Sequence, residues 1–425
     1  MKTFWRAVIG LVLALVLCAM ALVVVAVMAM APKEGEWRTS VALGPLEREA
    51  SVPALIRWAT HPLVRPHLQG RVLETRAGRW LLAQRADGSL DAVCAPCRVH
   101  LPGAGAEPVV MDRLRLIVNV RGADRFDGSL WIGAGAQPVV LPWRAELKAD
   151  GLHATAGLAP TPLAALLAPM AAQIPELARA RVDGRVALKL DVTLAAHGLV
   201  VRRLAPTLQD IAVDGLGTEA LLDVDPTQRC RPQPAGGRIE GWIQNAVIAA
   251  EDARFFEHPG YEVDPWVAAW KGNQQDGASL QGASTITQQL AKLLYTGDER
   301  SAARKVREWL YAVEMERTLG KGRILQLYLA VLPWGDGVCG AEAAARHHLG
   351  KPASQLKPRE AAWLAGLLVN PDRALRDWAR DDAAARDRAI AIVKGIRRLP
   401  RERREAEMAA LETWRPPIGR MAAAP

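Results

Sequence analysis

Cysteine is scarce in this sequence, with five residues in a chain of 425. Cys94 and Cys97 form a lone C-x-x-C pair, and no second pair completes the roughly four ligands that a structural zinc site needs. The pair is therefore expected to be a local disulfide or two thiols, with a redox role less favoured. Cys230 and Cys339 are expected to be unpaired.

Phenylalanine and tyrosine are also scarce, with four of each, whereas tryptophan occurs 14 times. Core packing is the first expectation for Trp242, Trp266, Trp270 and Trp334. Trp266 and Trp270 are one helical turn apart, so an equally favoured alternative is an apolar surface that dips into a lipid interface.

Acidic residues are outnumbered by basic ones, 45 against 54, which gives a formal net charge of +9 and a pI of about 9.6. This balance suits an anionic partner: nucleic acid, an acidic membrane surface or a phosphate-bearing substrate. The length is enough for two or three domains.

The amino terminus has a run without charge, Ala7 to Ala31, preceded by Lys2 and Arg6. The run exceeds the roughly 20 residues that cross a bilayer, and the flanking positive charges predict a cytoplasmic start. A cleaved signal peptide is less favoured, because its apolar region is usually only about 7–15 residues long. We expect a single-pass protein of the inner membrane with the rest of the chain in the periplasm, where nucleic acid is not an expected partner.

The remaining chain predicts a multidomain protein with a β-rich domain followed by a mostly α domain. Alternating apolar residues favour strands, and Asp-Gly pairs that begin at Asp87, Asp127, Asp150, Asp183 and Asp214 predict hairpin turns. One helical insert is expected at 161–180. The predicted organisation is an N-terminus and anchor at 1–32, a connector at 33–70, the β-rich periplasmic domain of unknown role at 71–225, a linker at 226–238, a helical domain at 239–372 and a charged helical tail with solvated faces at 373–425.

Two glutamates in the helical region stand in opposite surroundings. Glu251 lies on the edge of an apolar helical face, and apolar neighbours raise a carboxyl pKa toward the range of a general base or acid. Glu308 follows Arg304 and Lys305 by four and three residues, which either forms an ordinary surface ion pair or keeps a second carboxylate ionised. Two such carboxylates suit chemistry at an anomeric carbon.

A polar stretch lies between the two glutamates in the sequence. Its hydroxyl and amide side chains lead into positive charge, and such groups bind sugar hydroxyls and a pyrophosphate. These candidate binding residues are Ser284, Thr285, Gln288, Gln289, Lys292 and Arg300, and Arg304 and Lys305 join them.

Five segments in one order resemble the motifs of the family 51 glycosyltransferases, the peptidoglycan glycosyltransferases. They are EDARFFEHPG (251–260), GASTITQQLAK (282–292), RKVRE (304–308), KGRILQLYL (321–329) and GVCGAEAAARHHLGK (337–351). The resemblance covers roughly 238–372, about a third of the chain. It implies a lysozyme-like domain on the outer face of the membrane that polymerises lipid II into β-1,4-linked glycan, with inversion and release of undecaprenyl pyrophosphate.

The resemblance also implies roles for residues. Glu251 matches the general base, and Glu308 matches the glutamate that assists the leaving group, directly or through a divalent cation. Mg²⁺ or Mn²⁺ is implied, with Glu308 as a candidate ligand, and no organic cofactor. Implied partners are lipid II, the growing glycan strand, the cytoplasmic membrane, and transpeptidases or other cell-wall synthesis proteins.

Some positions depart from the family pattern. Leu293 replaces an expected Asn after the motif lysine, Ala330 replaces another, and the pair His347-His348 stands where an aromatic residue is usual. The elements of a transpeptidase domain are missing, apart from an S-x-x-K at 354–357 inside the helical region. The alternatives are a weakly active or inactive envelope scaffold of the same fold and a lysozyme-like hydrolase.

Overall fold

The computed structural model forms two compact units. The first unit comprises residues 1–172, 184–209 and 273–277, and the second comprises 173–183, 210–272 and 278–425. The structure describes residues 28, 31–33, 36–43, 46–75, 77–100, 107–195, 198–223, 238–272, 284–299, 301–335, 337–380 and 383–416. Within these ranges, no helix combines the length and apolar character that crossing a membrane requires. The predicted anchor lies outside the described residues apart from Met28, Ala31 and Pro32.

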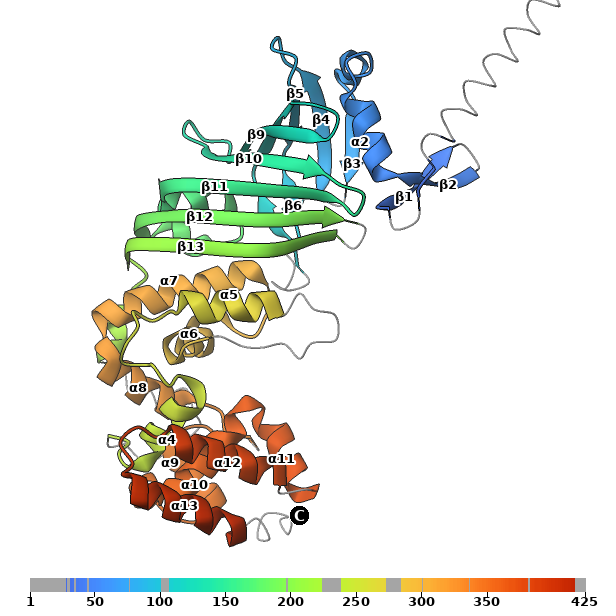
Figure 1. Cartoon of the computed structure of the whole chain (residues 1–425). Helices are drawn as coiled ribbons and strands as arrows, with labels where there is room; N and C mark the ends of the chain where they lie inside the picture. The colour runs from blue at the N-terminus through green and yellow to red at the C-terminus, as the bar shows by residue number, and fades with distance from the viewer. Residues whose placement is uncertain are drawn as a thin grey trace, which may run out of the picture. The chain divides into compact units, whose positions relative to one another are not determined.

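The first unit is built on a nine-stranded antiparallel sheet, shown in Figure 1. Its strands are β3 (Val72–Thr75), β4 (Gly78–Gln84), β5 (Leu90–Cys94), β8 (Leu114–Val120), β9 (Arg125–Ile132), β10 (Val139–Leu147), β11 (Leu152–Pro162), β12 (Arg181–Ala195) and β13 (Gly198–Asp214). They follow one another across the sheet, except that β6 (Cys97–Val99) and β7 (Val109–Met111) pair separately. The β-rich prediction is therefore confirmed.

Smaller elements accompany this sheet. The segment predicted as a connector contains the hairpin β1 (Arg38–Leu43) and β2 (Leu46–Ser51), the helix α2 (Val52–Thr60) and the 3₁₀ turn η1 (Arg65–Leu68). The predicted insert forms the short helix α3 (Leu163–Leu167) and the 3₁₀ turns η2 (Ala168–Met170) and η3 (Pro175–Ala178).

The Asp-Gly pairs mark hairpin turns at only some positions. Asp87 lies between β4 and β5 and Asp150 between β10 and β11, as predicted, whereas Asp214 ends β13. The prediction is wrong for Asp127 and Asp183, which lie inside β9 and β12. Gly128 serves a different need there, because a Cβ at this position would collide with the carbonyl oxygen of Ile117 on the next strand.

The C-x-x-C pair forms a disulfide in the core of the first unit. Cys94 and Cys97 are bonded to each other, and both are fully buried beside Leu114 and Trp80. This confirms the predicted local disulfide. The expectation for Cys339 is wrong, because its sulfur is also disulfide-bonded.

The second unit is helical. Its helices are α4 (Trp242–Glu251), α5 (Val263–Gly272), α6 (Ile286–Ala291), α7 (Ala302–Thr318), α8 (Gly320–Val331), α9 (Ala341–Leu349), α10 (Pro358–Gly366), α11 (Pro371–Arg380), α12 (Ala383–Gly395) and α13 (Arg401–Thr413). Shorter turns are η4 (Thr218–Leu222), the π-helical turn η6 (Lys292–Thr296), η7 (Ala353–Gln355) and η8 (Leu367–Val369). The prediction of a mostly α domain in this part of the chain is confirmed.

Helix packing in the second unit brings its carboxyl-terminal helices into the core. α10 packs against α4 and α12, while α6 packs against α7 and α8 (Figure 1). Ala389 and Val393 on α12 are fully buried. Beside the charged faces predicted for the tail, α12 therefore has an apolar face that its neighbours cover.

The tryptophans of this unit divide between core and surface. Trp334 is fully buried, and Trp242 lies under the guanidinium of Arg403, 5.1 Å from the ring centroid. Trp266 on α5 is 43% exposed, so core packing does not account for it. The side chain of Trp270 lies outside the described residues.

Candidate active site

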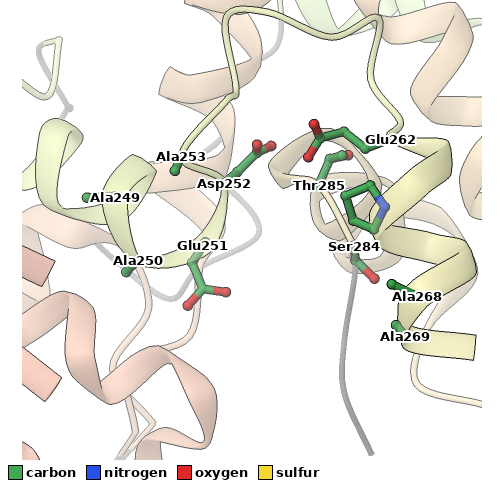
Figure 2. A pocket seen from close by; sticks show the side chains of 11 residues that line it. Ala249, Ala250, Glu251, Asp252, Ala253, Glu262, Ala268, Ala269, Ser284 and Thr285 are labelled. Carbon is green, nitrogen blue, oxygen red and sulfur yellow. The ribbon is translucent and has the colours of Figure 1, made fainter. Parts of the chain in front are cut away.

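A cavity of about 450 Å³ lies between the end of α4 and the start of α6. Figure 2 shows Glu251 and Asp252 on one side of this cavity and Ser284 and Thr285 on the other. Glu262 and small alanines from α4 and α5 complete the lining. The cavity therefore joins two of the sequence motifs.

Glu251 is the last residue of α4, and its carboxylate is largely buried, with 15% of the side chain exposed. Burial raises its pKa above the ordinary value of 4.5, which confirms the predicted direction. Two groups act in the opposite sense: Nε2 of Gln289 donates to Oε2 at 3.1 Å, and the charge of the Arg388 guanidinium lies 3.8 Å from Oε1. The site thus holds a carboxylate with a raised pKa between two groups that favour its ionised form.

The orientation of the Gln289 amide follows from Tyr328 on α8. The Tyr328 hydroxyl donates to Oε1 of Gln289 at 2.5 Å, which leaves Nε2 to face Glu251. Burial raises the pKa of Tyr328 well above its usual value, so this hydroxyl stays protonated and can donate. A chain of two hydrogen bonds therefore connects α8 to the carboxylate.

Asp252 and His258 connect the first two motifs. Nδ1 of His258 accepts from the Gly260 amide at 3.1 Å, so its Nε2 carries the proton and donates to Asp252 at 2.9 Å. Asp252 also accepts from the Ile286 amide at 2.9 Å, at the start of α6. This pair fixes the loop after α4 against α6.

Asp252, His258 and Glu262 also place ligand atoms within 4.8 Å of one another, as a bound metal ion would require. The donor set does not fit a metal, because both nitrogens of His258 are occupied by hydrogen bonds and Nε2 is protonated. Within the part of the chain that the structure describes, this is the one such group of three.

Glu308 lies on α7 and is 1% exposed, so it is not the surface ion pair that the sequence left open. Its carboxylate pairs with Arg304, and Nζ of Lys305 lies 2.8 Å from Oε2. Lys305 also donates to Ser284 Oγ at 2.5 Å, on the border of the cavity. Because cations occupy both carboxylate oxygens, Glu308 does not fit a divalent-cation ligand in this arrangement, and the predicted Mg²⁺ or Mn²⁺ requirement stays a prediction.

Lys305 has the lowered pKa expected of a buried amine. Burial lowers its pKa from 10.5 to about 8, and the charges of Arg304 and Lys292 add to the shift. At neutral pH the ammonium is still protonated and can meet an anionic ligand.

The remaining predicted binding residues are Thr285, Gln288, Lys292 and Arg300. Thr285 and Gln288 form a capping box at the start of α6, and Gln288 is 6% exposed, so its polar atoms support the helix and do not line the cavity. Lys292 lies in the turn η6 and pairs with Asp298 at 2.6 Å. Arg300 lies outside the described residues.

The departures from the family pattern lie at buried or half-buried positions, apart from His347. Leu293 is half-buried in η6, and Ala330 is buried on α8. His348 is buried against Trp363, while His347 is exposed. Nothing in the structure explains why leucine stands at 293.

Sequence reasoning missed two partners of the candidate base. Tyr328 lies in a quoted motif, but its role depends on where α8 packs. Arg388 lies in the charged tail, where nothing in the local sequence separates it from neighbouring arginines.

Comparison with known proteins places this site in a recognised region. Residues 224–396 match the model of the family described as Transglycosylase. Over 134 residues the chain is 47% identical to the biosynthetic peptidoglycan transglycosylase of Nitrosomonas eutropha, covering 32% of this chain and 55% of that protein. It is 45% identical to the protein of the same name from Laribacter hongkongensis over 135 residues, 32% of this chain and 59% of that one.

A third relative is the biosynthetic peptidoglycan transglycosylase of Azoarcus sp., 45% identical over 146 residues, 34% of this chain and 63% of that protein. The chain thus spans less than two thirds of the length of these relatives. The resemblance to the peptidoglycan glycosyltransferases is confirmed for the matched region, which extends beyond the predicted end at 372 and includes α12.

Proposed function

We propose that this protein is a peptidoglycan glycosyltransferase that polymerises lipid II, with Glu251 as general base and Glu308 supporting the leaving group. The observation that carries the proposal is the contrast between two buried carboxylates, one that lines the cavity and one that reaches its border through other side chains. Glu251 has a raised pKa, whereas Glu308 is surrounded by cations and is connected to the cavity through Lys305 and Ser284.

In the proposed reaction, the 4-hydroxyl oxygen of the acceptor GlcNAc attacks C1 of the donor MurNAc. The new C1–O bond forms as the bond from C1 to the pyrophosphate oxygen breaks, with inversion. Glu251 takes the hydroxyl proton and later returns it to water. The electron pair of the broken bond leaves with undecaprenyl pyrophosphate, whose charge Lys305, Arg304 and Lys292 neutralise.

Glu308 has a positioning role in this proposal. Its carboxylate holds Arg304 and Lys305 in place, and Lys305 reaches Ser284 at the cavity border. The anchor at 1–32 would hold the site beside its lipid substrate at the periplasmic face of the inner membrane. Transpeptidases or other cell-wall synthesis proteins are proposed as partners, as the family resemblance implies.

The test is polymerisation of labelled lipid II by the full chain, beside Glu251→Gln and Glu308→Gln. The exposed Glu257 lies in the same motif and supplies the matched control, Glu257→Gln. Glycan chains that disappear in the first two variants and persist in the control support the proposal. Equal inactivity of wild type and variants favours the scaffold alternative, and cleavage of finished glycan favours a hydrolase.

A further inference from the structure

Helix α7 has a second polar stripe beside the one that carries Glu308. Arg307, Tyr311, Glu314 and Thr318 are spaced by four, three and four residues, which places them on one face of the helix. At about 100° per residue, this face lies roughly a quarter-turn away from Glu308. Each of the four side chains contacts one of two segments that precede the matched family region, 173–183 and 210–223, here called the α7 brace.

The first contact is a buried ion pair. Glu176 is 4% exposed, and both of its carboxylate oxygens accept from Nε of Arg307 at 2.8 Å. Arg307 directly precedes Glu308. Removing the carboxylate would leave a largely buried guanidinium without this charge partner, which is more costly than loss of a surface pair.

The second contact extends to the turn that carries Lys292. Nη2 of Arg179 donates to the Tyr311 hydroxyl at 2.9 Å. The Tyr311 ring stacks on Tyr295, with centroids 4.1 Å apart and planes 3° from parallel. Since Tyr295 belongs to η6, the brace supports both α7 and the turn with Lys292.

The third contact holds the carboxyl-terminal half of α7. Glu314 is 1% exposed, and its two oxygens accept from the backbone amides of Leu216 at 2.7 Å and Thr218 at 3.2 Å. The Thr218 and Thr318 hydroxyls lie 2.8 Å apart. The loop reaches this position through Gly217 at a φ of 84°, a conformation that favours glycine.

These contacts use two buried carboxylates that the proposed mechanism leaves without a role. Glu176 lies outside the residues that the family model matches, and so do the backbone donors to Glu314. We infer that the α7 brace holds Glu308 and Lys305 in register with the cavity, so that Glu176 and Glu314 are positioning residues for the reaction. This inference rests on the proposed function, and it assigns part of the chain before the matched region a role in the chemistry.

The test compares Glu176→Gln and Glu314→Gln with Glu407→Gln in the full chain. Glu407 is the matched control because it is 8% exposed and accepts from Arg359 at 2.8 Å, on α13 and away from α7. The measurements are kcat and KM for labelled lipid II, the thermal midpoint, the pH–rate profile, and hydrogen exchange of peptides that span 301–318. Activity is measured well below the lowest thermal midpoint, so that all variants are folded.

We expect Glu176→Gln and Glu314→Gln, here called the brace variants, to lower kcat about tenfold with KM within about twofold. The reason is that a small misplacement of reacting groups lowers the rate strongly. The basic limb of their pH–rate profile should move above pH 8, since a shifted Lys305 is less buried. The control should lose thermal stability without either change. Brace variants that match the control in kcat and in the basic limb overturn the inference.

The same experiment separates this inference from the proposed function. If the wild type makes no glycan, the proposed function fails. Hydrogen exchange then tests whether the brace orders α7. Faster exchange over 301–318 in Glu176→Gln than in Glu407→Gln supports the brace as an ordering element. Equal exchange in Glu176→Gln and Glu407→Gln overturns it.

Discussion

Nε2 of Gln289 donates a hydrogen bond of 3.1 Å to Oε2 of Glu251, across 38 residues of sequence. The amide could equally present its oxygen, which would repel an ionised carboxylate. Tyr328 donates to that oxygen, which supports the orientation in which the amide nitrogen faces Glu251.

Replacement of Tyr328 by Phe removes the hydroxyl that orients Gln289. We expect kcat to fall about fivefold to tenfold, the equivalent of about one hydrogen bond, with KM nearly unchanged. Steady-state kinetics with labelled lipid II measure this. Tyr261→Phe is the control, because it keeps the ring against Trp309 and changes nothing at Gln289. An unchanged kcat in Tyr328→Phe would show that the amide needs no such support.

Glu251→Gln should be inactive and yet more resistant to unfolding. The raised pKa means that folding favours the neutral carboxyl, so ionisation lowers stability as pH rises through the folded-state pKa, above 4.5. We expect a higher thermal midpoint than wild type above that pKa and no gain near pH 4. Glu257→Gln should show no gain, because Arg397 lowers the pKa of Glu257. A lower midpoint for Glu251→Gln at every pH would contradict the prediction.

Lys305 should set the basic limit of activity. Its pKa of about 8 means that the ammonium loses its proton just above neutral pH, and with it the charge that meets a pyrophosphate. We expect kcat/KM to fall about tenfold per pH unit above that value. In Lys305→Arg the limb should move beyond pH 10, since a guanidinium stays charged. A profile that is the same in both proteins would assign the limb to another group.

Arg388 should set the acid limit. Its guanidinium lowers the pKa of Glu251 against the larger effect of burial, so Arg388→Gln should raise that pKa and move the acid limb of kcat/KM to higher pH. Arg388→Lys keeps a charge and should move the limb less. The difference should shrink at high salt, because the Arg388 side chain is 38% exposed.

Arg386→Gln is the control for this series, because Arg386 lies on the same helix but pairs with Glu412. Thermal midpoints check that loss of the bond from Arg388 to the Gly366 carbonyl leaves the variants folded. An acid limb that responds equally to Arg386→Gln would remove Arg388 from its assigned role.

Local sequence was sufficient where the physical cause is local. Alternating residues predicted the sheet, and a helical period with apolar neighbours predicted the buried Glu251. The spacing of Arg304, Lys305 and Glu308 predicted their ion pairs, because residues three and four apart share a helix face. The order of the five motifs predicted the family match over the helical region.

Contacts between distant segments required the tertiary structure. An Asp-Gly pair can form a turn or lie inside a strand, and the neighbouring strand decides which. At Gly128 that strand approaches too closely for a side chain. Gln288 and Gln289 are adjacent in sequence, yet one caps a helix and the other orients the base. Arg388 resembles every other arginine of the tail until α12 packs beside α4 and α10.

The sequence by itself determined the chemistry available to this protein: two glutamates, their nearby cations and a polar stretch in a recognisable order. Only the tertiary structure decided how those groups are held, because burial and orientation arise from helices that pack over long separations. Glu176 shows this most directly, since 131 residues separate it from Arg307 and no local pattern indicates the pair.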